Sequence, residues 1–160
     1  FVSAENVGTS FTFYIPAAVE DSGDKLLEVR SKPQDGQHKT LLLVDDEELL
    51  RKTAEDILCE HNYRVLIAQN VEEAMHIFTN HRNEIDVVIT DIVMPIMNGM
   101  ELIKVLRSIQ PGIKIIATGG LLYEQAGKNI KDIGAFDVLL KPYTASQLLN
   151  SVERAIAAAG

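Results

Sequence analysis

Cysteine is almost absent from this chain of 160 residues, since Cys59 is the only one. A single cysteine excludes an internal disulfide and is typical of proteins from a reducing compartment. Long apolar runs are also missing, because none approaches the roughly 18 residues of a membrane-spanning helix. Lys and Arg number 15 against 23 Asp and Glu, and the net charge of −8 argues against nucleic-acid binding, which needs a basic face.

Motifs of two other classes are missing as well. Neither G-x-x-x-x-G-K nor G-x-G-x-x-G occurs, which argues against a nucleotide-binding enzyme. The chain begins at Phe1, and its opening segment lacks the basic and apolar regions of a signal peptide. We therefore expect a piece of a longer protein that contains one globular domain and some extra length.

From Thr40 onward, short apolar runs alternate with stretches of helical periodicity. The runs are rich in Val, Ile and Leu, as in strands that are buried on both faces of a sheet. The expected strands are residues 40–44, 64–68, 85–90, 114–118 and 136–140. Amphipathic helices are indicated by apolar stripes at Leu50, Ala54, Ile57 and Leu58 and at Leu148, Leu149, Val152 and Ile156. Five strands, each followed by a helix, predict an α/β fold: a doubly wound, flavodoxin-like parallel sheet with strand order 2-1-3-4-5 and helices on both faces.

The helix between the fourth and fifth strands has the least favourable sequence. Its apolar face would consist of Leu122, Tyr123, Ala126 and Ile130. Gly127 in its middle costs about 1 kcal/mol relative to alanine. We expect this helix to be the element that is most easily displaced.

The sequence ahead of Thr40 has a different character. Residues 19–39 are polar and contain Pro33 and Gly36, which predicts a linker. Residues 10–15 alternate apolar and polar side chains, the pattern of one β-strand. A lone strand cannot bury its apolar face, so we expect this one to come from a sheet that is otherwise missing, and to pair with another copy or with the domain that follows.

Polar residues stand where the predicted strands end. Asp45 and Asp46 follow the first strand, Asp91 the third and Lys141 the fifth, while Thr118 ends the fourth. Ligands of such sheets lie beyond the carboxyl ends of the strands, so these side chains should converge on one site. Clustered carboxylates repel one another, and a hard divalent cation relieves the repulsion.

Each of these residues also has an ordinary structural explanation. Asp45 or Asp46 could cap the next helix, and Asp91 could begin a turn. Lys141 could extend to solvent, and Thr118 could be a β-branched strand residue. The functional interpretation rests on their occurring together, because the first and third strands are neighbours in the predicted order.

Four motifs in this segment, LLLVDDE, DIVMPIMNG, IIATGG and LLKP, resemble the receiver domain of two-component signalling from about Thr40 to Ala158. The resemblance implies a phosphoacceptor that takes a phosphoryl group from the phosphohistidine of a kinase dimerisation domain or a histidine phosphotransfer domain. It implies that Asp91 is the acceptor and that Thr118 and Lys141 bind phosphoryl oxygens.

The same resemblance implies a Mg²⁺ cofactor. Asp46, Asp91 and the backbone carbonyl of Val93 would bind the ion, and Asp45 would act largely through water. It further implies a cis peptide bond between Lys141 and Pro142.

The segment NVGTSFTFYIP resembles the end of the ATP-binding domain of sensor histidine kinases of the GHKL type, in which G-x-G-T-x-F is usual and Asn6 replaces the first glycine. We therefore expect a kinase remnant at residues 1–18, a linker at 19–39 and a receiver domain at 40–160. This order describes a hybrid sensor histidine kinase. The fragment would be a cytoplasmic, self-phosphorylating acceptor, and the parent kinase could itself be anchored in a membrane.

Two rival functions use the same kind of fold. Phosphatases of the haloacid-dehalogenase type carry D-x-D on the first strand, whereas the acidic pair here is adjacent. An interaction module that works without phosphorylation would have lost acidic or lysine positions, and none is lost here.

The sequence departs from the receiver pattern at one position, because Val138 replaces a common Tyr or Phe. Activation should therefore appear mainly as movement of residues 119–134. A separate expectation is that copies of the domain could dimerise through the face formed by the fourth helix, fifth strand and fifth helix.

Overall fold

The computed structural model describes residues 2–4, 8–10, 36–94, 99–119 and 134–158, and the chain divides into one unit at residues 1–30 and another at 31–160. In the first unit, β1 (Val2–Ala4) pairs antiparallel with β2 (Gly8–Ser10). The sequence predicted a single strand at residues 10–15. Residues 11–15, on which most of that prediction falls, lie outside the described part of the chain.

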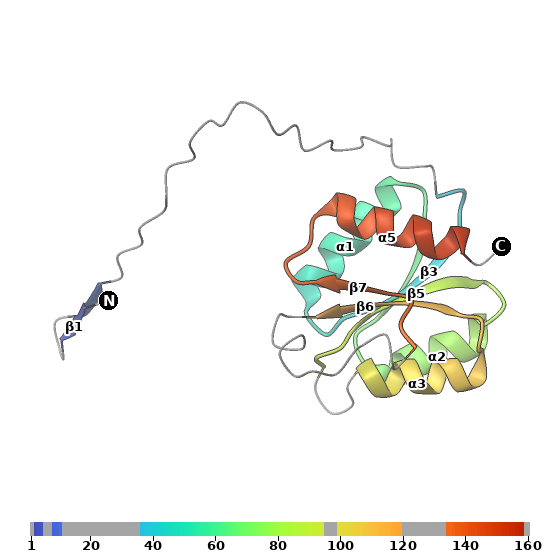
Figure 1. Ribbon diagram of the computed structural model, residues 1–160, viewed down its shortest axis with the longest axis horizontal. Coiled ribbons are helices and arrows are strands. Elements are labelled where there is room, and N and C mark those ends of the chain that lie inside the picture. Colours follow the sequence, from blue (N-terminus) through green and yellow to red (C-terminus); the bar gives the residue numbers. More distant parts are fainter. Residues whose placement is uncertain (1, 5–7, 11–35, 95–98, 120–133, 159–160) are drawn as a thin grey trace. The chain divides into compact units, whose positions relative to one another are not determined.

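The second unit contains a five-stranded parallel sheet in the order β4-β3-β5-β6-β7 (Figure 1). Its strands are β3 (Thr40–Val44), β4 (Arg64–Ala68), β5 (Ile85–Asp91), β6 (Lys114–Gly119) and β7 (Asp137–Leu140). Counted from β3, this is the predicted order 2-1-3-4-5. The flavodoxin-like fold is therefore confirmed.

Four described helices cover the two faces of the sheet. Figure 1 shows α1 (Glu48–Glu60) and α5 (Ala145–Ala157) on one face, with α2 (Val71–His81) and α3 (Gly99–Ile109) on the other. The start of α2 is set by Asn70, whose side chain accepts from the Glu73 N–H, and α5 begins with a capping box of Thr144 and Gln147. The helix expected between the fourth and fifth strands lies outside the described residues.

The core consists of two apolar layers, one on each face of the sheet. Along β3, Leu42 and Val44 pack toward α2 and α3, whereas Leu41 and Leu43 pack toward α1 and α5. Every residue of β3 is buried, as expected for a central parallel strand. No helix in the described part of the chain is both long enough and apolar enough to cross a membrane.

The apolar stripe predicted for α1 is correct only in part. Ala54 and Leu58 are buried, and Ile57 packs against the same layer. Leu50 remains 37% exposed, because it lies on the first turn of the helix, where its neighbours line an open pocket.

The last residues of the expected linker pack on the sheet unit. The Gly36 N–H donates to the carbonyl oxygen of His61, and Lys39 forms an ion pair with Asp86. A side chain at position 36 would meet the Tyr63 ring and the same carbonyl oxygen at less than 3 Å. The described part of this unit therefore begins four residues before β3.

Candidate functional site

The carboxyl ends of four strands bring the predicted site residues together. Asp45 directly follows β3, Asp91 is the last residue of β5, and Lys141 directly follows β7. Thr118 lies beside Asp91 in the parallel register of β5 and β6, and the Ile92 N–H donates to its carbonyl oxygen. The Lys141 N–H in turn donates to the carbonyl oxygen of Gly119 at 2.8 Å. Main-chain pairing therefore places these residues in adjacent rows at one edge of the sheet.

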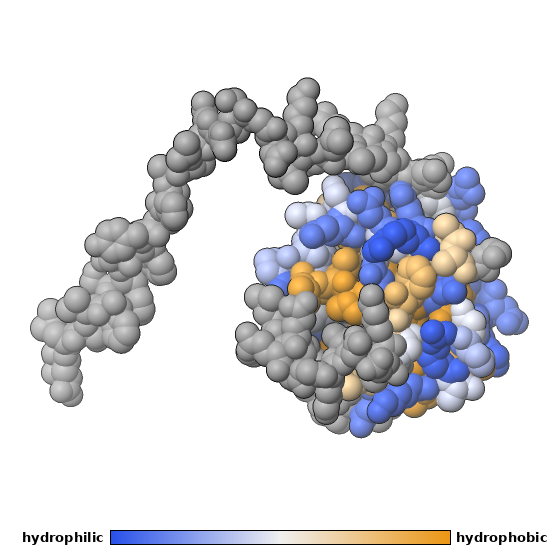
Figure 2. Space-filling model, in the orientation of Figure 1, coloured by the Kyte–Doolittle hydropathy of each residue, from blue (hydrophilic) through white to orange (hydrophobic). Residues whose placement is uncertain are grey.

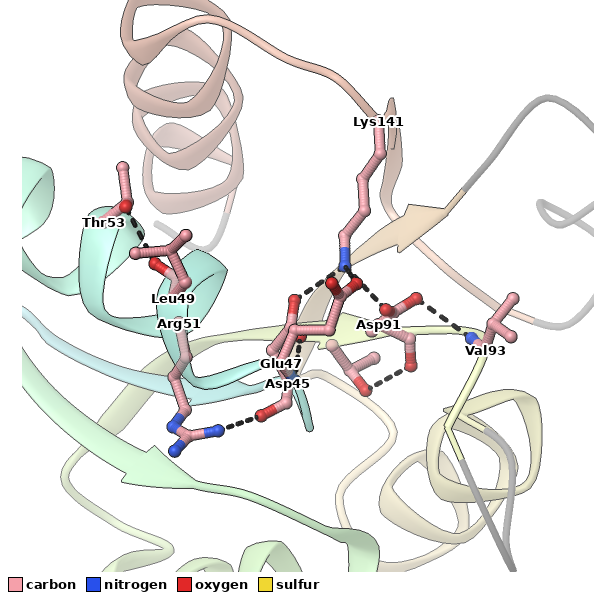
Figure 3. Close-up of polar contacts among 9 residues, drawn as sticks. Asp45, Glu47, Leu49, Arg51, Thr53, Asp91, Val93 and Lys141 are labelled. Atoms are coloured by element: carbon pink, nitrogen blue, oxygen red, sulfur yellow. Dashed lines mark hydrogen bonds and ion pairs between the residues drawn. The ribbon is translucent and has the colours of Figure 1, made fainter. Parts of the chain in front are cut away.

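Lys141 lies between two buried carboxylates (Figure 3). Its Nζ donates to Asp45 Oδ2 at 2.8 Å and to Asp91 Oδ2 at 2.6 Å. Asp45 and Asp91 are only 3% and 4% exposed. Burial by itself would lower the Lys141 pKa, but the hydrogen bonds to Asp45 and Asp91 outweigh it, and the pKa is raised. The ammonium group is therefore charged at neutral pH and balances part of the negative charge of the site.

The second oxygen of each of these carboxylates accepts a backbone hydrogen bond. The Glu47 N–H donates to Asp45 Oδ1 at 2.9 Å, and the Val93 N–H donates to Asp91 Oδ1 at 2.9 Å. Each aspartate thus forms a short turn with the residue two positions ahead. One oxygen is held by the main chain and the other faces Lys141, so both carboxylates have fixed orientations.

The main chain of Asp91 is held equally closely. The Thr90 hydroxyl donates to the Asp91 carbonyl oxygen at 3.0 Å, and the Gly99 N–H donates to the carbonyl oxygen of Ile92 at 3.1 Å. A Cβ atom at position 99 would lie 1.9 Å from the Asp91 carbonyl oxygen, so only glycine allows this approach. Gly99 is the first residue of α3.

A group of three carboxylates could hold a metal ion. Asp45, Asp46 and Asp91 each offer an oxygen, and these atoms lie within 4.8 Å of one another. Asp46 is exposed, unlike the other two. Oxygen donors, a partly open position and a net negative charge fit Mg²⁺, which keeps several waters when it binds to proteins. The residues present therefore fit the ion that the resemblance implies.

Two further residues border the site. Glu47 is the N-cap of α1, and its carboxylate lies 3.8 Å from the Lys141 Nζ. Its backbone is extended rather than helical, so its side chain has a different direction from those on the helix. Arg51 was not predicted at all, yet its Nη1 donates to the Asp45 carbonyl oxygen at 2.6 Å. The peptide bond between Lys141 and Pro142 is cis, as predicted.

An apolar pocket of about 390 Å³ opens beside Lys141. It lies between the first turns of α1 and the segment after β7, and its apolar lining includes Leu50, Ile57, Pro142 and Tyr143. Leu49, on the same turn of α1, is 79% exposed. Figure 2 shows further hydrophobic side chains at the surface in the middle of the view, where Figure 1 draws β7 between the two layers of helices. The acidic site is therefore bordered by a surface that could contact another protein.

Comparisons with known proteins agree with this geometry. The family model described as response regulator receiver domain matches residues 41–153. The chemotaxis protein CheY of Thermotoga maritima is 31% identical over 117 residues, which is 72% of this chain and 96% of that protein. A receiver domain protein from Clostridium thermocellum has a similar structure, with a TM-score of 0.70 and 33% identity over 74% of this chain and 94% of that one.

Longer proteins match as well. The sensor kinase CckA of Brucella abortus is 30% identical over 153 residues, which is 91% of this chain but 16% of that kinase. The chain spans 47% of a probable transcriptional regulator, ycf27, of Cyanidium caldarium. With the matched segment, the parallel sheet and the acidic site with its lysine, this chain belongs to the response regulator receiver domain family.

Proposed function

We propose that this domain accepts a phosphoryl group on Asp91 from a phosphohistidine, in a two-component phosphorelay. The observation that carries the proposal is the position of Lys141 Nζ within 2.8 Å of both Asp45 Oδ2 and Asp91 Oδ2. A buried carboxylate with a fixed orientation and an adjacent cation is suited to nucleophilic attack on phosphorus.

The chemical step uses the Asp91 oxygen that is not held by the main chain. Asp91 Oδ1 accepts from the Val93 N–H, so Oδ2 is the attacking atom once Lys141 turns toward the incoming phosphoryl group. A bond forms between Oδ2 and phosphorus while the bond from phosphorus to the histidine nitrogen breaks. The leaving imidazole keeps the electron pair of that bond and takes up a proton from water.

Lys141 and Thr118 would bind oxygens of the transferred group. Lys141 Nζ lies 2.6 Å from Asp91 Oδ2, and the Thr118 hydroxyl can rotate to donate to a new anion. Asp46, Asp91 and the carbonyl of Val93 would hold Mg²⁺ directly, with Asp45 acting largely through water. When bound, the ion neutralises charge on the transferring oxygens.

The conformational response would begin at Thr118. Phosphorylation adds between one and two negative charges beside this residue, and the next residue, Gly119, is the last of β6. Residues 120–133, in which we expect the main movement, lie outside the described part of the chain. Position 138 carries a valine, which packs against the core layer of α2 and α3. Activation by the inward turn of an aromatic ring is therefore not available at this position.

The donor would be a helical protein that carries the phosphohistidine. The exposed Leu49 and the pocket lined by Leu50 and Tyr143 adjoin Lys141, so a helix seated there would present its histidine to Asp91. Replacing Leu49 with Asp should slow transfer from such a protein but not from acetyl phosphate, which needs no docking surface. Equal slowing with both donors would contradict this role.

The match to CckA supports a hybrid kinase as the parent protein. It covers 91% of the chain, whereas residues 40–160 make up only about three quarters, so the similarity extends ahead of the receiver. We propose that residues 1–18 are the end of a GHKL-type ATP-binding domain.

Copies of this chain could associate through the N-terminal strand or through the face of the fourth helix, fifth strand and fifth helix. Sedimentation of this chain, compared with a version that starts at Lys39, tests this association.

Phosphotransfer profiling tests the function as a whole. Purified histidine phosphotransfer domains, phosphorylated on histidine, are mixed with the wild-type chain and with Asp91→Asn in the presence of Mg²⁺. We expect label on the wild type within seconds to minutes for one or a few donors, and none on the variant. Binding of the donors without any transfer of label would favour the alternative of a phosphorylation-independent module. Continuous release of phosphate from unrelated phosphoesters would favour the phosphatase.

A further inference from the structure

Arg51 links the first helix to the acidic end of the first receiver strand. It lies in the first turn of α1, and its side chain folds back so that Nη1 donates to the carbonyl oxygen of Asp45 at 2.6 Å (Figure 3). The residue is half-buried in this position. A charged donor at this distance forms a strong hydrogen bond, about twice as strong as one between neutral groups.

The location of this cation is unfavourable for the helix itself. Positive side chains are disfavoured in the first turn, because the helix dipole places partial positive charge there. The neighbouring Lys52 instead pairs with Glu55 and Asp56 on the outer face of α1. Arg51 therefore contributes through its contact with the strand end rather than through helix stability.

The bonded carbonyl belongs to the peptide that joins Asp45 to Asp46. In the part of the chain that the structure describes, Asp46 has no side-chain hydrogen bond, and the direction of its carboxylate depends on that peptide. Asp45 is held on its other sides, since its N–H donates to Ala68 and its Oδ1 accepts from Glu47. Arg51 supplies the remaining restraint, on the carbonyl itself.

We propose that Arg51 is a positioning residue that orients the Asp45–Asp46 peptide, and through it the exposed Asp46 carboxylate, for Mg²⁺ binding. This inference rests on the proposed function, in which Asp46 is a metal ligand. The expected effect of Arg51 on Mg²⁺ affinity is opposite in sign to the effect of its charge alone, because a guanidinium near the site repels a cation. Removing the charge would by itself tighten Mg²⁺ binding, whereas removing the restraint weakens it.

Direct titration of the whole chain with Mg²⁺ separates these two effects. Arg51→Met keeps the aliphatic part of the side chain and removes the donor, and it should bind Mg²⁺ about tenfold more weakly, as is typical when a group that supports a metal ligand is lost. Arg51→Lys should be intermediate, because its shorter side chain still carries a donor. Lys52→Met, which removes an adjacent cation without contact to the site, should remain within about twofold of wild type.

Amide hydrogen exchange in the absence of metal gives a second measurement, which does not require Mg²⁺ to be bound. In Arg51→Met, the Glu47 N–H, which donates to Asp45 Oδ1, should exchange faster, while the N–H groups of β3 and β5 should be unchanged. Mg²⁺ affinity equal to or tighter than wild type, with unchanged exchange at Glu47, overturns the inference. If the wild type itself binds no Mg²⁺, the metal part of the proposed function fails, and the exchange result alone decides the role of Arg51.

Discussion

Replacement of Lys141 by methionine removes the cation that separates two buried carboxylates while keeping most of the side-chain volume. The Lys141 ammonium group donates to Oδ2 of Asp45 at 2.8 Å and to Oδ2 of Asp91 at 2.6 Å. Without Lys141 the two carboxylates face each other as like charges, and no other cation among the described residues is hydrogen-bonded to either carboxylate. The metal-free variant should therefore be considerably less stable than the wild type.

The structure sets the size of this effect. Since both oxygens lie within 2.8 Å of one nitrogen, they are at most about 5.5 Å apart. Two unit charges at this separation repel by about 3 kcal/mol at an effective dielectric constant of about 20. Breaking a buried ion pair by removing one partner typically costs about 3–5 kcal/mol. Because the lysine side chain is 17% exposed and water can enter, we expect a loss of about 2–4 kcal/mol.

Urea unfolding followed by circular dichroism in EDTA measures the loss. Lys52→Met is the matched control, since that lysine is exposed and pairs only on the surface of α1, and its replacement should change the stability little. Adding Mg²⁺ should restore stability more strongly in Lys141→Met than in the wild type, because the ion then replaces the missing charge. If Lys141→Met is as stable as the wild type in EDTA, the account of the charge balance is refuted.

Three further predictions follow from other contacts. Gly99→Ala should lower the free energy of unfolding by about 1–3 kcal/mol, because its Cβ would lie 1.9 Å from the main-chain oxygen at the end of β5; Gly112→Ala, whose Cβ meets no atom within 4 Å, is the control in the same urea titration. Because the pKa of Lys141 is raised in the folded state, its contribution to stability is complete below pH 10.5 and is lost as the pH rises through the folded-state pKa. The wild type should therefore lose more stability than Lys141→Met when unfolding is measured at increasingly alkaline pH. Parallel stability curves for the two proteins would contradict this. Asp46→Ala should weaken Mg²⁺ binding far more than Glu47→Ala in a metal titration, because only Asp46 belongs to the carboxylate group within 4.8 Å; comparable affinities would exclude this ligand set.

The sequence predicted the five strands of the parallel sheet closely, because polar residues interrupt nearly continuous apolar runs. β3 and β4 have the predicted bounds, and β5 and β6 each extend one residue further, to Asp91 and Gly119. Their main chains are still paired with neighbouring strands at these positions, although the side chains are polar or absent. β7 begins one residue late, at Asp137.

The convergence of Asp45, Asp91 and Lys141 could also be predicted, because parallel strands end at one edge of the sheet. The contacts within the site could not. Which oxygen of each carboxylate faces Lys141 depends on turns two residues long, and the approach of Gly99 to Asp91 depends on how α3 packs. The role of Arg51 had no signal in the spacing of motifs, since a basic residue in a first helical turn is usually solvated.

Intact-mass analysis after incubation with acetyl phosphate and Mg²⁺ tests the central claim most directly. The wild type should gain one phosphoryl group, and Asp91→Asn should gain none. Asp45→Asn, which alters the neighbouring carboxylate that shares Lys141, should still accept one group at a lower rate, because the nucleophile is intact. Equal labelling of wild type and Asp91→Asn would show that Asp91 is not the phosphoacceptor.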